Sequence, residues 1–160
     1  MFISFTGIDG SGKTTQIDLL SKYLIAKGHD LFISKAYTRK EKELFQSYIQ
    51  EIDQIAIMFL FQAFHTQQYL SVKDSLDKNK TVIADRWDES YQAYHSIYGI
   101  LAKNPNLRNE LNFLAFQNLK PEVCFFIDTD PKVTIERTKE RGQDYFDKLS
   151  MSYHVKMSLS

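Results

Sequence analysis

The stretch Gly7-Ile8-Asp9-Gly10-Ser11-Gly12-Lys13-Thr14 decides the fold of this chain. It fits the phosphate-binding pattern G-x-x-x-x-G-K-S/T at every required position. Residues 2–5 before it form a short apolar run typical of a buried strand, and residues 14–27 after it carry apolar side chains at helical spacing. A strand, a glycine-rich loop and a helix therefore follow one another in the order that this kind of loop requires.

The loop has a chemical reason for its residue types. Glycines let backbone N–H groups converge on a phosphate, and the N-terminus of the following helix adds partial positive charge. Lys13 is predicted to reach the β- and γ-phosphates, and the Thr14 hydroxyl to bind Mg²⁺. The glycine spacing, G-x-x-G-x-G, does not match the dinucleotide pattern G-x-G-x-x-G. The residues expected around the donor phosphates are Gly7, Gly10, Ser11, Gly12, Lys13, Thr14 and Thr15.

Composition limits the classes of protein that remain. A chain of 160 residues with 43% hydrophobic content predicts one domain, and equal numbers of basic and acidic residues argue against a nucleic-acid surface. The only cysteine, Cys124, excludes an internal disulfide and favours the cytoplasm. The first apolar run is too short for a signal peptide, and the run at 55–61 is too short to span a membrane. The four histidines share no zinc-ligand spacing.

The rest of the chain alternates strand and helix patterns. Strands are predicted at 31–33, 81–84 and 123–127, and helices at 43–50, 53–79, 89–98, 104–119, 130–141 and 143–160. This alternation predicts a three-layer α/β fold with a parallel sheet of about four strands and helices on both faces. Because the first strand leads into the loop and the third ends in Asp85, we expect these two strands to be neighbours, in the order 2-3-1-4.

Two packing predictions accompany this fold. The run Val123 to Ile127 is continuous and apolar, as buried parallel strands are. The first helix is expected to turn a single face inward, with Ile17, Leu20, Leu24, Leu19 and Tyr23 on it or beside it.

A second constellation, Asp85-Arg86-Trp87, follows the third strand. A carboxylate there can hold Mg²⁺ or orient an attacking oxygen, and the neighbouring arginine can hold the phosphate of an acceptor. The alternative is a strand-terminal ion pair without a ligand. Ser90 and Tyr94 then lie on a polar and aromatic helix face, which suits a nucleoside or ordinary core packing.

Four blocks in sequence order, 5–16, 60–63, 85–94 and 126–128 with two downstream arginines, make the chain resemble the thymidylate kinases of the nucleoside-monophosphate kinase group. The resemblance implies that the α/β fold is a three-layer P-loop kinase fold. The resemblance implies that Asp9 hydrogen-bonds the acceptor's 3′-hydroxyl, that Phe61 stacks on the base, and that Tyr94 presses on the sugar beside Ser90. His65 stands where the family has a base-reading arginine, so it becomes a candidate for contact with the base.

The resemblance also implies which positive charges surround the phosphates during phosphoryl transfer. Arg86 and Arg39 would hold the acceptor phosphate, while Lys13 and Mg²⁺, held by Thr14 and Asp85, would neutralise the transferred group. The resemblance implies that the arginines at positions 137 and 141 belong to a lid at about 137–147, with Arg137 near the donor and Arg141 catalytic. Relative to the family this lid is short, and the chain ends before the family's last strand and helix. A homodimer is implied as well.

The leading hypothesis is an ATP-dependent kinase that transfers a phosphoryl group to a deoxynucleoside monophosphate, with dTMP as the expected acceptor and ATP and Mg²⁺ as cofactors. Two alternatives stay open. His65 leaves room for another nucleotide or a nucleoside as acceptor, and the short lid leaves room for a degenerate nucleotide-binding protein without turnover.

Overall fold

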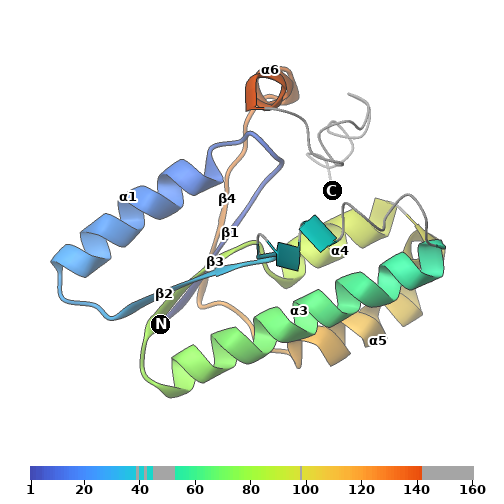
Figure 1. Ribbon diagram of the computed structural model, residues 1–160, viewed down its shortest axis with the longest axis horizontal. Coiled ribbons are helices and arrows are strands. Elements are labelled where there is room, and N and C mark those ends of the chain that lie inside the picture. The colour runs from blue at the N-terminus through green and yellow to red at the C-terminus, as the bar shows by residue number, and fades with distance from the viewer. Residues whose placement is uncertain (39, 42, 45–52, 98, 142–160) are drawn as a thin grey trace.

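The computed structural model describes residues 1–38, 40–41, 43–44, 53–97 and 99–141. The elements follow in the order β1 (Phe2–Thr6), α1 (Lys13–Ala26), β2 (Leu31–Lys35), α3 (Gln54–Asp77), β3 (Thr81–Asp85), α4 (Asp88–Ile97), η1 (Ile100–Lys103), α5 (Pro105–Phe116), β4 (Val123–Phe126) and α6 (Pro131–Arg141) (Figure 1). The helices predicted at 43–50 and 143–160 fall largely or wholly outside the described residues.

The four strands form one parallel sheet in the order β2-β3-β1-β4. This confirms the predicted fold class and strand order. In the register of the sheet, Phe5 lies beside Asp85, and Thr6 lies beside Phe126. Because the carboxyl ends of parallel strands share one edge, the loop after β1 and the Asp-Arg pair after β3 meet there.

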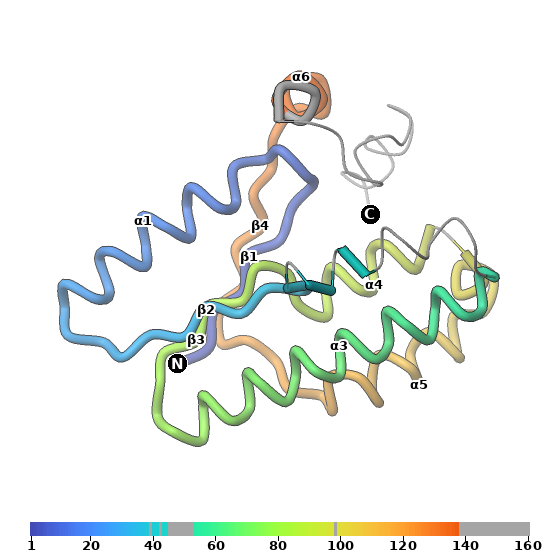
Figure 2. The backbone as a smooth tube through the Cα atoms, in the orientation of Figure 1, coloured from blue at the N-terminus to red at the C-terminus, as the bar shows by residue number. Residues whose placement is uncertain are grey.

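Helices cover both faces of the sheet. In Figures 1 and 2, α1 lies on one side of the strands, and α3 and α5 lie on the other. Side chains alternate accordingly along β1: Ile3 and Phe5 pack with Ile17 and Leu24 of α1, whereas Phe2 faces the opposite layer. The larger core lies in that second layer, between the sheet and α3, α4 and α5.

Trp87, directly after the Asp-Arg pair, is the largest fully buried side chain among the described residues. Its ring packs edge-on against Phe2 at 5.0 Å and against Phe116 at 4.7 Å between centroids. The indole Nε1–H donates to the carbonyl of Leu119 at 2.9 Å. Trp87 therefore joins β1, the turn after β3 and the end of α5.

Two packing predictions were wrong. All four residues of β4 are exposed to the solvent, because β4 is the edge strand beside β1 and none of the described helices packs extensively against it. In α1, Leu19 is 57% exposed and Tyr23 is 59% exposed. At about 100° per residue, both point well away from Ile17, which is buried.

None of the described helices combines the length and the hydropathy that crossing a membrane requires.

Candidate active site

The loop between β1 and α1 has the backbone geometry of an anion-binding turn. Gly7 has φ +142°, and a Cβ there would lie 2.6 Å from the carbonyl oxygen of Ile127, so only glycine fits. Gly12, immediately before α1, has φ +98°, in the left-handed region. The loop therefore delivers the chain to the N-terminus of α1, where free N–H groups and the helix dipole favour a phosphate.

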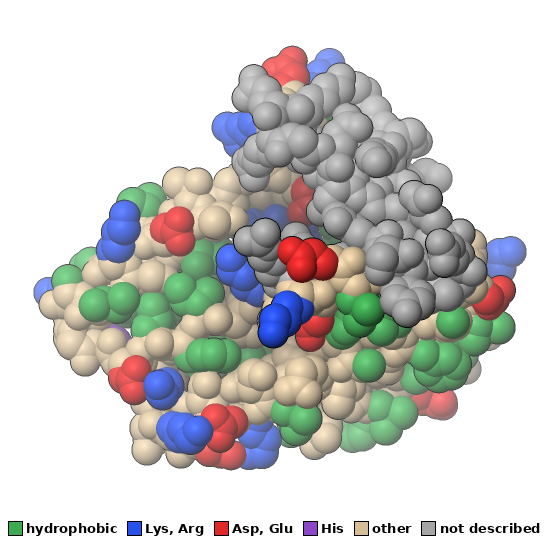
Figure 3. Space-filling model, viewed as in Figure 1, with side chains coloured by type: hydrophobic (Ala, Val, Ile, Leu, Met, Phe, Trp, Pro, Cys, Tyr) green, Lys and Arg blue, Asp and Glu red, His purple; other side chains and the backbone are tan. Residues whose placement is uncertain are grey.

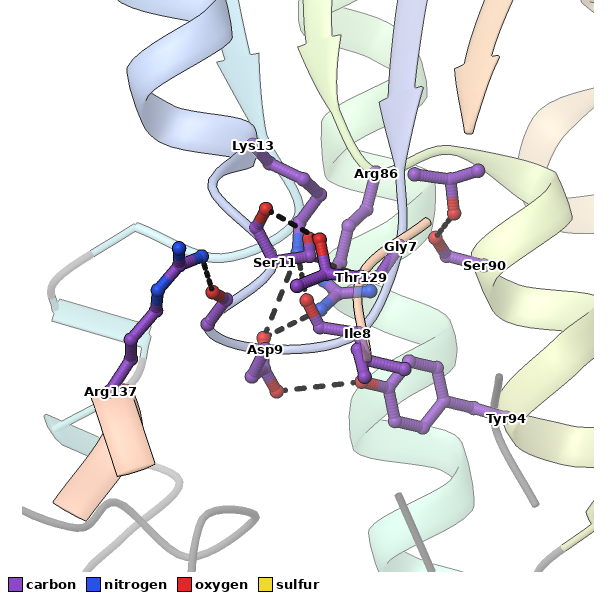
Figure 4. A network of polar contacts seen from close by, with 12 residues as sticks. Gly7, Ile8, Asp9, Ser11, Lys13, Arg86, Ser90, Tyr94, Thr129 and Arg137 are labelled. Carbon is purple, nitrogen blue, oxygen red and sulfur yellow. Dashed lines mark hydrogen bonds and ion pairs between the residues drawn. The ribbon is translucent and has the colours of Figure 1, made fainter. Parts of the chain in front are cut away.

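The side chain of Lys13 extends from the start of α1 back toward this loop, as Figure 4 shows. Its side chain is buried, and Nζ donates to the carbonyl oxygens of Gly7 and Ile8, each at 2.9 Å. Nζ also lies 4.0 Å from Oδ1 of Asp9. Lys13 is thus positioned at the loop, and its contact with phosphate stays a prediction.

Two side chains from beyond β4 hold the outer side of the loop. Oγ1 of Thr129 donates to the carbonyl of Ser11 at 3.1 Å, and the guanidinium of Arg137 in α6 donates to the carbonyl of Gly10 at 3.1 Å (Figure 4). Arg137 therefore reaches the predicted donor loop. The side chain of Arg141 lies outside the described part of the structure. Thr129 was not predicted, because its partner is a backbone carbonyl.

Arg86 joins the loop through Asp9. The guanidinium lies 2.6 Å from Oδ1 of Asp9, and Oδ2 of Asp9 accepts from the hydroxyl of Tyr94 at 3.5 Å. The Arg86 guanidinium also stacks near the ring of Tyr94, 5.3 Å from its centroid. Burial opposes the charge of Arg86, but the neighbouring Tyr94, Asp9 and Asp85 outweigh it and raise its pKa above the ordinary value. Arg86 is therefore a permanent cation.

The backbone of Arg86 is fixed on both sides. Its φ of +74° is in the left-handed region, which costs a non-glycine residue about 1 kcal/mol. Its N–H donates to the carbonyl of Phe5 at 2.9 Å, and its own carbonyl accepts from Nε2 of Gln68 at 3.0 Å. Gln68 is buried in α3 and was not predicted. The only sequence signal was its polarity at an inward position of an apolar helix.

The oxygen atoms expected to hold Mg²⁺ lie at the same edge of the sheet. Thr14 is the second residue of α1 and is exposed, and Asp85 is the last residue of β3 and is half-buried. A hydroxyl and a carboxylate are hard ligands that suit Mg²⁺, which commonly takes one or two protein oxygens together with substrate phosphates. Among the described residues, no three His, Cys, Asp or Glu side chains gather at one point, and such a site needs none.

The loop itself also fits a nucleotide. Ser11 Oγ is buried and has no hydrogen-bond partner within the described residues, so a hydroxyl donor is available in the loop. Thr15 is exposed in the first turn of α1. These features, with the N-terminus of α1, suit a polyphosphate.

Ser90 has a structural partner at the end of β1. Its side chain is buried, and its Oγ lies 2.7 Å from Oγ1 of Thr6 (Figure 4). Ser90 therefore ties α4 to the strand that leads into the loop, and its predicted contact with substrate stays a prediction.

The residues predicted to hold the base form an aromatic group around Tyr37. The Tyr37 ring lies 5.6 Å from Phe61 and 5.8 Å from His65, between centroids. Burial, followed by Tyr94, raises the pKa of Tyr37 above its ordinary value; the positive charge of Arg86 opposes this shift, and Asp9 adds to it. Tyr37 therefore stands between this group and the Asp9 cluster. Arg39 lies outside the described residues.

His65 itself is uncharged at neutral pH. It is 6% exposed, and burial lowers its pKa to about 3, with His95 adding to the effect. Its ring contacts Tyr91 and Phe116, each at 5.3 Å. His65 can therefore offer a neutral hydrogen-bonding group to a base, and not a positive charge.

A parallel sheet in the order 2-3-1-4, with a phosphate loop after β1 and an Asp-Arg pair after β3, defines a P-loop nucleotide-binding protein of the α/β class. The family model described as thymidylate kinase matches residues 5–159. The chain therefore belongs to the thymidylate kinase family.

Individual relatives agree. The chain is 32% identical over 173 residues to a thymidylate kinase from Thermosipho melanesiensis, covering 99% of this chain and 85% of the relative. It is 36% identical over 154 residues to one from Fervidobacterium nodosum, covering 92% and 76%. Among solved structures, the crystal structure of thymidylate kinase from Ehrlichia chaffeensis matches with 30% identity and a TM-score of 0.65, covering 88% of this chain and 82% of that one.

Proposed function

We propose that the chain transfers the γ-phosphoryl group of ATP to the 5′-phosphate of dTMP, giving ADP and dTDP. One observation carries this proposal beyond family membership: a single carboxylate, Asp9, lies 4.0 Å from the phosphate-loop lysine Lys13 and 2.6 Å from Arg86. The cation for the donor phosphates and the cation for the acceptor phosphate thus flank one residue, which would bring the two bound phosphates close together, as in-line transfer requires.

On the donor side, the backbone N–H groups of the loop would bind the phosphates of ATP. Lys13 would exchange its two loop carbonyls for phosphate oxygens, and Arg137 would supply further positive charge from α6. Thr14 and Asp85 would hold Mg²⁺, which supplies Lewis-acid neutralisation of charge on the phosphates when it is bound. Positioning and charge neutralisation account for catalysis, because phosphoryl transfer needs little covalent help from the protein.

On the acceptor side, Arg86 would bind the 5′-phosphate, with Arg39 as a second cation. Asp9 would accept from the 3′-hydroxyl, and Tyr94 would contact the sugar from the side of the guanidinium on which it already stacks. Phe61 and His65 would contact the base. His65 would act as a neutral group, because it remains unprotonated at neutral pH.

The proposal extends to assembly and location. Exposed apolar side chains lie along α3 and α5 (Figure 3), a feature that favours a protein interface, so we propose a homodimer formed through these helices. They are Ile55, Phe59 and Leu70 of α3 and Leu107, Phe113 and Leu114 of α5.

We place the reaction in the cytoplasm, because Cys124 is an exposed free thiol, which suits a reducing compartment.

The function is tested with a coupled assay for ADP over dTMP, dUMP, dCMP, dGMP and thymidine. We expect the highest kcat/KM for dTMP, about tenfold or more above dUMP, because an apolar pocket discriminates one methyl group to about that degree. A reaction without acceptor gives the background hydrolysis. Turnover of thymidine but not of dTMP would contradict the proposed function.

Removing the Thr129 hydroxyl tests the outer support of the loop. Thr129→Val keeps the shape of the side chain but leaves the carbonyl of Ser11 without this donor. We expect KM for ATP to rise about fivefold with little change in kcat, because one such hydrogen bond contributes about 1 kcal/mol. Thr129→Ser retains the hydroxyl and is expected to rescue KM. An unchanged KM in Thr129→Val, or an equal rise in Thr129→Ser, would contradict this role.

A further inference from the structure

The carboxylate of Asp9 lies among three groups that can donate hydrogen bonds. Oδ1 accepts from Arg86 at 2.6 Å and lies 4.0 Å from Nζ of Lys13, and Oδ2 accepts from Tyr94 at 3.5 Å (Figure 4). The contact with Arg86 is the shortest of these, and the Arg86 side chain is only 15% exposed. A short, charge-assisted and partly desolvated pair of this kind is the strong type of hydrogen bond.

Arg86 can change partners through its side chain but not through its backbone. Its backbone is fixed by the carbonyl of Phe5 and the amide of Gln68, and these contacts involve no substrate group. A phosphate that reaches the guanidinium therefore meets it close to the carboxylate of Asp9. Two anions then share one cation, and like charges at short range repel each other. Binding of a phosphate at Arg86 weakens the contact between Arg86 and Asp9.

We propose that Asp9 couples the two recognition groups of the acceptor: the phosphate draws Arg86 away from Asp9, and a sugar hydroxyl replaces the guanidinium as the donor to Asp9. This inference rests on the proposed function, since it assumes a phosphorylated nucleoside at this site. It makes Asp9 a specificity-determining residue that selects acceptors carrying both groups. The pairing of Asp9 with Arg86 is the observation from which it follows.

The coupling follows from comparing acceptors that carry only one of the two groups with an acceptor that carries both. An acceptor with a hydroxyl but no phosphate meets a carboxylate already satisfied by Arg86. An acceptor with a phosphate but no hydroxyl takes Arg86 and leaves Asp9 beside a second anion with its strongest partner weakened. An acceptor with both groups completes the exchange. The 3′-hydroxyl therefore contributes more to the binding free energy of a monophosphate than to that of a nucleoside.

Four ligands measure this coupling as a cycle: dTMP, 3′-deoxythymidine 5′-monophosphate, thymidine and 3′-deoxythymidine. Dissociation constants are determined by calorimetry, with weak ligands followed by displacement, for the wild-type chain and Asp9→Asn. In the wild type, loss of the 3′-hydroxyl should raise the dissociation constant of the monophosphate by a factor about tenfold larger than for the nucleoside. The ratio of the two factors is therefore about 10, the size expected when a charged group loses one hydrogen bond. In Asp9→Asn this ratio should fall to about 1, because the amide carries no charge to exchange.

A second readout separates the exchange from a simple contact with the hydroxyl. The 3′-deoxy monophosphate has no hydroxyl to lose, so it should bind Asp9→Asn several times more tightly than wild type, because Arg86 is released. Weaker binding of this ligand to the variant would overturn the exchange. So would a wild-type ratio near 1, or an equal ratio in both proteins.

The wild-type cycle alone decides the inference if Asp9→Asn fails to fold, which thermal melting reports. Failure of the proposed function is distinguishable. If dTMP neither binds nor yields ADP, both proposals fall together. If dTMP is turned over and the wild-type ratio is near 1, only the exchange at Asp9 is wrong.

Discussion

Lys13→Ala is expected to lower kcat/KM for phosphoryl transfer about 10³-fold, the loss typical when one positioned donor to a developing negative charge is removed. Lys13 is the only residue that enters the loop pattern as a required cation, and its Nζ already lies among the loop carbonyls of Gly7 and Ile8. Its removal takes away the positive charge nearest to the expected β- and γ-phosphates. The ADP-coupled assay with dTMP measures the effect.

Two further variants separate charge from loop support. Lys22→Ala removes an exposed lysine of the same helix and should leave kcat/KM within about twofold, since surface changes of this kind have small effects. Lys13→Arg keeps the charge with different geometry and should recover only part of the activity, because the two cations are not interchangeable. A Lys13→Ala enzyme within tenfold of wild type would contradict the donor site described above.

Trp87→Ala is expected to lower the free energy of unfolding by about 3–5 kcal/mol, as truncation of buried large aromatic residues does. The change removes the ring that packs against Phe2 and Phe116 and leaves the carbonyl of Leu119 without its donor. For a chain of this size, the melting temperature should fall by about 10 °C. Urea denaturation followed by circular dichroism measures the free energy directly.

Leu19→Ala is the matched control for this prediction. Leu19 is apolar and lies on a helix against the same sheet, but it is 57% exposed. Its truncation should change the free energy of unfolding by no more than about 0.5 kcal/mol, as exposed positions do. If Leu19→Ala and Trp87→Ala were equally destabilising, the packing described here would be wrong.

The sequence alone was sufficient for the topology. The order 2-3-1-4 followed from a local requirement, that the strand before the loop and the strand before Asp85 be neighbours, and the register beside Phe5 confirms it. The burial of β4 was not predictable in this way. Apolar residues such as Val123 and Phe125 give the same pattern whether or not helices cover the strand, and the predicted order placed this strand at the edge without showing what covers its faces.

The site was predictable one residue at a time, but not as a network. Asp9 and Arg86 were each predicted as a contact for substrate, and the structure shows that they also contact each other. No periodicity relates two residues so far apart in sequence. Thr129 and Gln68 were not predicted, because each binds a backbone carbonyl, and the sequence does not show which carbonyl a polar side chain will reach.

The left-handed backbone at Arg86 has a consequence for protein engineering. Glycine or asparagine adopts φ +74° more easily than arginine, so backbone strain alone favours these residues at position 86. The same replacements remove the guanidinium that pairs with Asp9. Backbone strain and turnover therefore favour different residues at this position. A stabilisation campaign that leaves position 86 open needs an activity readout at every round.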